Sequence, residues 1–170
     1  LKVVATTTQL TDFASVVGGD DIELTGLLHA GTSAHHFDPS PADLLALGQA
    51  DVLIVNGAGL ETFVESAVEA SGFDGTVINA SDGIDEALAK EITAESGESH
   101  DHEHEHAEEA HDHDHGDLNP HIWTSPRFAE GMVTEIATGL AAADPEHASE
   151  FTDRADNYVE QLQDLDTWIT

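Results

Sequence analysis

The chain has 170 residues, a length that fits one domain of ordinary size or one domain with part of a second. Its 35 acidic residues face only 4 basic ones, which excludes a nucleic-acid binder acting through basic patches and disfavours an anionic membrane surface as partner. Cysteine is absent, so any metal must be bound by histidine nitrogens and carboxylate oxygens. No apolar run in the sequence approaches the length of a membrane span.

The first half of the chain alternates predicted strands with predicted helices. In chain order, apolar spacing and turn residues predict a strand at 1–5, a helix at 8–17, a strand at 22–28, a loop at 31–40, a helix at 41–50, a strand at 51–55, a turn at 56–59, a helix at 60–70 and a strand at 76–79. Because the run Val52-Leu53-Ile54-Val55 is continuously apolar, we expect that strand to be buried on both faces.

This alternation predicts an α/β fold with a parallel sheet flanked by helices and joined by right-handed crossovers. Ligand sites in such sheets lie in loops at the carboxyl ends of the strands. The loop at 31–40 and the turn at 56–59 both follow predicted strands, so both qualify by position.

Two helices are predicted at the end of the chain. One begins at Ser125-Pro126, and the other is capped by Asp144-Pro145 and still apolar on one face at residue 169. At about 1.5 Å per residue the second helix spans roughly 35 Å. We expect residues 1–143 to form one α/β lobe and residues 144–170 to start a truncated connecting helix whose second lobe is absent. The numbering is expected to start after processing or trimming.

Residues 98–117 form a tract in which histidine alternates with acidic residues. The tract offers imidazole and carboxylate donors for zinc, copper or nickel, but it encodes no fixed geometry, so we expect loose capture of several ions on a disordered backbone. The alternative is a solvated acidic loop without metal. Its seven histidines are His100, His102, His104, His106, His111, His113 and His115.

The acidity extends beyond this tract. Outside it, the sequence still has 26 acidic residues and only 4 basic ones. Such a surface is typical of a protein made for high salt, where self-repulsion is screened, so we expect a halophilic source. The alternative is an acidic protein from an ordinary source.

Single histidines outside the tract are weak signals by themselves. His35 and His36 are adjacent in a loop, and neighbours in an extended chain point in opposite directions, so at most one is expected to face a site. His121 lies between a proline and Ile122-Trp123, and taken singly it could be a core residue. His29 and His147 are expected to have no functional role.

Two segments together make the chain similar to a known family. The segment His35-His36-Phe37-Asp38-Pro39-Ser40-Pro41-Ala42-Asp43 resembles the H-x-[YF]-[ED]-P-x-P-x-D segment of the zinc- and manganese-binding solute-binding proteins of ABC importers. Asn119-Pro120-His121-Ile122-Trp123 resembles that family's [DN]-P-H-x-W segment. Residues 50–61 are similar to the strand and turn that lie between them in the family, and a His/acid-rich loop is typical of the zinc-specific members.

This resemblance implies one lobe of a helical-backbone periplasmic-binding-protein-like fold. It also implies that His35 and His121 are metal ligands in a cleft, that His36 takes a variable position, and that a second lobe supplies a third histidine and a carboxylate. The implied protein is an extracytoplasmic receptor, lipid-anchored before trimming, that delivers Zn²⁺ to the membrane permease of an ABC importer. It is not an enzyme.

The alternatives concern both the metal and the function. Neutral imidazole is a good zinc donor, whereas manganese prefers more oxygen ligands, so the histidines favour Zn²⁺ over Mn²⁺. A manganese-binding member of the family stays open, as does a metal-dependent surface adhesin. A two-histidine zinc hydrolase is disfavoured because the sequence has no HExxH or GxSxG motif.

Overall fold

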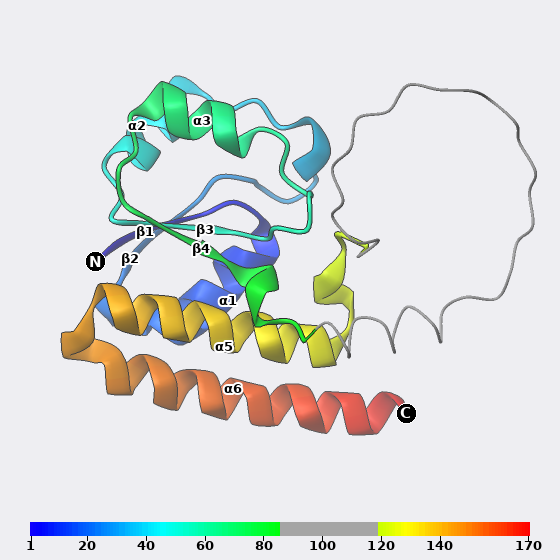
Figure 1. Ribbon diagram of the computed structural model, residues 1–170. Helices are drawn as coiled ribbons and strands as arrows, with labels where there is room; N and C mark the ends of the chain where they lie inside the picture. The colour runs from blue at the N-terminus through cyan, green and yellow to red at the C-terminus, as the bar shows by residue number, and fades with distance from the viewer. Residues whose placement is uncertain (86–118) are drawn as a thin grey trace, which may run out of the picture.

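The computed structural model describes residues 1–85 and 119–170. Its centre is a parallel sheet in the order β2-β1-β3-β4, as Figure 1 shows. The strands are β1 (Lys2–Ala5), β2 (Glu23–Gly26), β3 (Val52–Val55) and β4 (Thr76–Asn79). In the register of the sheet, Val4 lies beside Thr25 on one side and Leu53 on the other. The predicted parallel α/β sheet is therefore confirmed.

Helices cover both faces of this sheet (Figure 1). One face carries α2 (Pro41–Gly48) and α3 (Val64–Ser71). The other carries α1 (Thr8–Gly18) and α5 (Pro126–Ala143), while α6 (Ala148–Ile169) packs on α5 and α1. Short 3₁₀ turns join these elements: η1 (Gly19–Asp21), η2 (Ala34–His36), η3 (Ala80–Gly83), η4 (Ile122–Thr124) and η5 (Pro145–His147).

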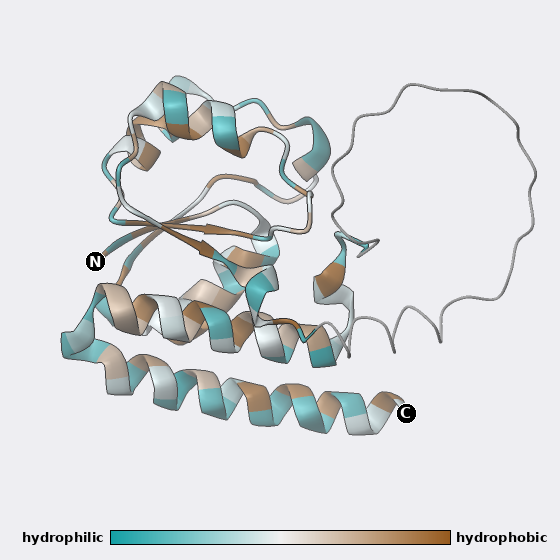
Figure 2. Ribbon diagram, viewed as in Figure 1, coloured by the Kyte–Doolittle hydropathy of each residue, from teal (hydrophilic) through white to brown (hydrophobic). Residues whose placement is uncertain are grey.

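The two faces of the sheet bury two separate cores, because successive side chains of a strand point to opposite faces. Val52 and Ile54 of β3 join the core under α1 and α5, whereas Leu53 and Val55 join the core under α2 and α3. All four are buried, as the continuous apolar run predicts. Strands at the centre of the sheet are accordingly coloured as hydrophobic in Figure 2.

Two predicted elements are shorter in the structure by three residues, more than any other described element of the first half. The ladder of β2 ends at Gly26, although Leu27 and Leu28 beyond it are buried. Helix α3 begins at Val64 rather than at residue 60: Gly57, Ala58 and Gly59 of the preceding turn all have positive φ, and residues 60–63 after them are not yet helical. The histidine-rich tract, 98–117, lies outside the described residues.

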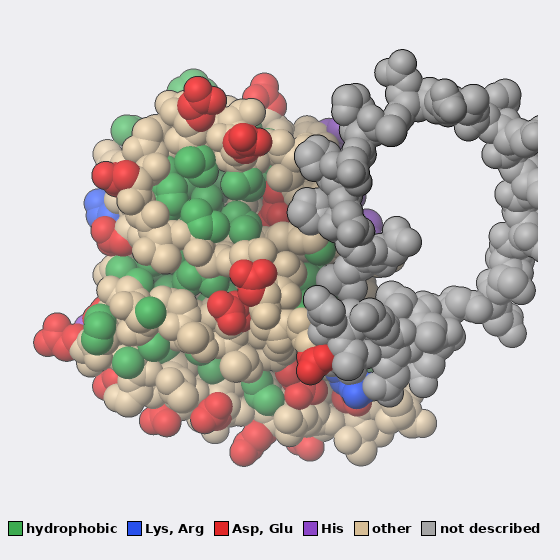
Figure 3. Space-filling view, viewed as in Figure 1, with side chains coloured by type: hydrophobic (Ala, Val, Ile, Leu, Met, Phe, Trp, Pro, Cys, Tyr) green, Lys and Arg blue, Asp and Glu red, His purple; other side chains and the backbone are tan. Residues whose placement is uncertain are grey.

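The long C-terminal helix is present as predicted, with 22 residues in α6. No helix within residues 1–85 and 119–170 is long and apolar enough to cross a membrane. Acidic side chains are scattered over the face seen in Figure 3 and outnumber the basic ones there. The halophilic source and the division of the chain at residue 143 stay predictions.

Candidate metal centre

Two segments from distant parts of the sequence meet at the carboxyl edge of the sheet. The loop after β2 carries His35 in η2, where the Ser33 hydroxyl accepts a hydrogen bond from the His35 backbone N–H at 3.3 Å. The loop ends where Ser40 forms a capping box with Asp43 at the start of α2. His121 lies directly before η4, which leads into α5. The loops thus place each imidazole next to a helix whose position is fixed by the sheet.

The two imidazoles face each other at a separation that suits one zinc ion. Their Nε2 atoms are 3.5 Å apart, and their ring centroids are 5.5 Å apart with an edge-to-face tilt. Two nitrogens bound to tetrahedral zinc at about 2.0–2.1 Å lie roughly 3.3–3.4 Å from each other. The observed separation is close to this value, and both side chains are exposed at the pocket.

The ring of His121 is held in one orientation. Asn119 Oδ1 lies 2.9 Å from His121 Nδ1 and also accepts the His121 backbone N–H at 3.0 Å. Because an amide oxygen can only accept, Nδ1 carries the proton and Nε2 presents its lone pair toward His35. Trp123 packs against the other side of the ring, with centroids 5.3 Å apart.

His35, His121 and Trp123 line a pocket of about 290 Å³, which also includes His29 and residues at the start of α1. The expectation that His29 has no role is therefore open to test. His36 is exposed and does not line this pocket, and it lies in a 3₁₀ turn rather than in the extended chain assumed from the sequence. Within residues 1–85 and 119–170, no acidic side chain lines the pocket.

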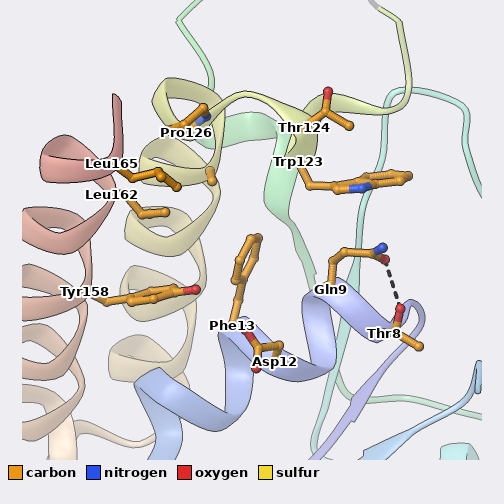
Figure 4. A pocket seen from close by; sticks show the side chains of 11 residues that line it. Thr8, Gln9, Asp12, Phe13, Trp123, Thr124, Pro126, Tyr158, Leu162 and Leu165 are labelled. Carbon is orange, nitrogen blue, oxygen red and sulfur yellow. Dashed lines mark hydrogen bonds between the residues drawn. The ribbon is translucent and has the colours of Figure 1, made fainter. Parts of the chain in front are cut away.

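A second pocket, of about 400 Å³, adjoins the first. Figure 4 shows Phe13 of α1, Tyr158 and Leu162 of α6, and Trp123 around it. Trp123 lines both pockets. Burial is the main cause that raises the pKa of Tyr158, and the nearby carboxylate of Asp12 adds to it. This pocket is chiefly aromatic and aliphatic, so it does not resemble a metal site.

His147 lies away from the pocket, between α5 and α6. Its Nδ1 is 2.9 Å from Asp144, and its Nε2 is 3.8 Å from Asp21. The hydrogen bond to Asp144 is the main cause that raises the pKa of His147, and it also lowers the pKa of Asp144. His147 is therefore part of a polar cluster at the junction between the end of α5 and the start of α6.

Among the described residues, 1–85 and 119–170, no group of three or more His, Asp or Glu side chains could hold a metal ion. The pocket therefore offers one facing pair of imidazoles, from His35 and His121, and leaves other coordination positions to further donors. Sequence reasoning missed two residues behind the pocket, Asn56 and Glu61, although both belong to the strand-and-turn segment that carries the family resemblance.

Comparison with known proteins identifies relatives of this chain. The family described as zinc-uptake complex component A, periplasmic, matches residues 3–170. The high-affinity zinc uptake system protein ZnuA of Bacillus subtilis is 33% identical over 98% of this chain and 49% of its own length. The manganese-binding lipoprotein MntA of the same organism is 30% identical over 99% of this chain and 48% of its own length.

Solved structures agree with this assignment. The metal-dependent lipoprotein YcdH of Bacillus subtilis superposes with a TM-score of 0.74 at 25% identity, covering 99% of this chain and 54% of its own. The chain thus spans about half the length of the relatives it matches. Together with the fold and the two family segments, these matches show that the chain belongs to the periplasmic zinc-uptake component A (ZnuA) family.

Proposed function

We propose that this chain is the metal-binding lobe of an extracytoplasmic receptor that captures Zn²⁺ and delivers it to the permease of an ABC importer. The observation that carries the proposal is the pair of Nε2 atoms, from His35 and His121, 3.5 Å apart with one ring already oriented. Membership of the family supports the transport role and a location outside the cytoplasm. The two Bacillus subtilis relatives are named as a manganese-binding lipoprotein and a high-affinity zinc uptake system protein, which supports a role in metal binding and uptake.

Zinc is favoured over manganese by the donor atoms. Imidazole nitrogen suits zinc, and zinc stands above manganese in the general affinity order of divalent metals at nitrogen and oxygen sites. In the part of the chain that the structure describes, the pocket lining supplies nitrogens and hydroxyls but no carboxylate. A manganese site needs more oxygen ligands of this kind. The relatives nevertheless include both a zinc and a manganese receptor, so Mn²⁺ is the alternative ion.

Two imidazoles fill half of a tetrahedral zinc site. We propose that water or donors from a second lobe take the other two positions. In this proposal the histidine-rich tract collects ions and passes them to the pocket. Its contribution must be separated from that of the pocket by experiment.

The test is a zinc titration against a chromophoric chelator in a background where the seven tract histidines are serine. We expect His35→Ala and His121→Ala each to weaken zinc binding by more than the 10–100-fold typical of losing an outer partner of a ligand. His36→Ala is the matched control, because it removes a neighbouring exposed imidazole outside the pocket, and it should leave affinity unchanged. A double His35→Ala/His121→Ala chain that binds zinc like its parent would overturn the proposal.

A further inference from the structure

Glu61 is a half-buried carboxylate behind the pocket that joins the ends of two strands. Its Oε1 accepts hydrogen bonds from the Thr6 hydroxyl at 2.5 Å and from the Asn56 backbone N–H at 2.7 Å. Its Oε2 accepts from the Gly57 N–H at 3.2 Å. Thr6 directly follows β1 and Asn56 directly follows β3. Because hydrogen bonds to an ionised carboxylate are stronger than neutral ones, Glu61 fixes these two strand ends relative to each other.

Asn56 carries this connection onward to the segment that bears His121. Asn56 is fully buried, and its side-chain NH₂ donates to the carbonyls of Gly57 and Pro120, each at 3.0 Å. Since both partners are carbonyl oxygens, only the NH₂ end of the amide can face them. The amide orientation is therefore set by its two acceptors.

The contact with Pro120 acts on the peptide group next to His121. The carbonyl oxygen of this peptide accepts from Asn56, and its N–H, which belongs to His121, donates to Asn119 Oδ1. The same peptide plane is thus held from both sides. Ile122, buried in the core, anchors the segment, but an apolar contact does not fix the rotation of the preceding peptide.

In the described part of the chain, this arrangement leaves the side-chain oxygen of Asn56, Oδ1, unpaired, which costs free energy. Asn56 Oδ1 is buried and has no hydrogen-bond partner among residues 1–85 and 119–170. An unpaired buried acceptor is unfavourable and is rare in folded proteins, so its presence calls for an explanation. The two hydrogen bonds that the NH₂ group donates, to Gly57 and Pro120, provide this explanation, because the same amide orientation makes both.

We propose that Asn56, held by Glu61, is a positioning residue that sets the His121 imidazole at its distance from His35. The inference rests on the proposed function, because it concerns the metal affinity of the same pair. Metal ligands must be held within about 0.5 Å of their productive geometry. The bridge from the end of β3 to Pro120 supplies such a constraint across 64 residues of sequence.

The test compares Asn56→Ala and Glu61→Gln with their parent, in the background without tract histidines. We expect Asn56→Ala to weaken zinc binding by about 10–100-fold, as is typical when an outer partner of a ligand is lost, and Glu61→Gln to weaken it less. Asn79→Ala is the matched control: it removes an asparagine at the end of the neighbouring strand β4 that bonds Ser81 and Asp82 instead. It should bind zinc like the parent.

A second measurement separates positioning from a general structural role. With Co²⁺ in place of Zn²⁺, the visible absorption spectrum reports the ligand geometry, and Asn56→Ala should change it while circular dichroism shows a folded chain. In a His121→Ala background the Asn56→Ala change should have no further effect on metal affinity. If Asn56→Ala does not fold, Glu61→Gln is subjected to the same two measurements and decides the outcome.

The outcomes distinguish the two proposals. If His121→Ala alone leaves zinc binding unchanged, the proposed metal site is wrong and the positioning role is lost with it. If His121→Ala weakens binding but neither Asn56→Ala nor Glu61→Gln does, only the positioning role is refuted. An equal loss from Asn56→Ala with and without His121 would also refute it, because the effect would then not pass through that imidazole.

Discussion

Asn119 offers a sharp test of how the pocket is organised. Its side-chain oxygen accepts two hydrogen bonds from His121, from the ring Nδ1 at 2.9 Å and from the backbone N–H at 3.0 Å. Replacing Asn119 by alanine removes both bonds. The imidazole of His121 is then free to rotate and to place its proton on either ring nitrogen.

The expected loss can be worked from these two contacts. A neutral hydrogen bond contributes about 1 kcal/mol net, so two such bonds correspond to roughly 2 kcal/mol. Every 1.4 kcal/mol is about tenfold in affinity. If both bonds stabilise only the ring orientation that binds metal, their loss makes the zinc complex about 30-fold weaker. This value lies within the 10–100-fold loss of metal affinity that is typical when a metal-binding side chain loses the group it is hydrogen-bonded to.

The assay is chelator competition with zinc at neutral pH, in the chain without tract histidines. Asn119→Asp is the matched control, because it keeps an oxygen acceptor in place and should retain or increase affinity by making the imidazole more basic. If Asn119→Ala binds zinc as tightly as the parent, the ring is held by other contacts. If Asn119→Asp loses as much as Asn119→Ala, the acceptor is not the relevant feature.

Two further predictions concern stability rather than metal. Because its hydrogen bond to Asp144 raises the pKa of His147, protonated His147 stabilises the fold below about pH 6.5, and this stability is lost as pH rises through the raised pKa. Thermal melts should therefore show the effect of His147→Ala near pH 5.5 and little effect near pH 9; an equal effect at both would contradict the assignment. Phe151→Ala, at a fully buried position on α6, should cost about 3–5 kcal/mol in urea unfolding. Leu165→Ala, on an exposed part of the same helix, should cost far less, and similar losses would argue against the packing of α6 described above.

The sequence predicted the fold well where apolar periodicity decides the structure. The apolar run of β3 and the apolar stripe of α5 follow directly from the burial of their side chains. The predicted start of α3 was wrong. Leu60 and Phe63 are apolar and buried, and their spacing fits that of the helix, so the pattern extends the helix too far toward the N-terminus. The turn before the helix was predicted, but residues 60–63 are not helical, and Glu61 among them accepts a hydrogen bond from the Asn56 N–H at the end of β3, which hydrophobic spacing does not record.

The candidate metal site was harder to predict from the sequence than the fold. His35 and His121 are 86 positions apart, and only the resemblance to a family linked them, because no local spacing encodes a distance between two loops. Helix or strand periodicity likewise does not reveal that His29 turns toward the same pocket. Asn119 is different: an acceptor two residues before a histidine is visible in the sequence, but its bond to Nδ1 depends on the turn that η4 imposes.

Charge and coordination make separate contributions in this chain. A formal charge of −31 raises the local concentration of any cation, including magnesium and calcium, and salt screens this attraction. Among the residues that the structure describes, however, the pocket is lined by three histidines and no acidic side chain. Hard cations prefer oxygen ligands, so they gain little from entering it, whereas zinc gains imidazole bonds. On the function proposed above, the acidic surface attracts metal without selecting it, and selection falls to the two facing imidazoles and the side chains that hold them in place.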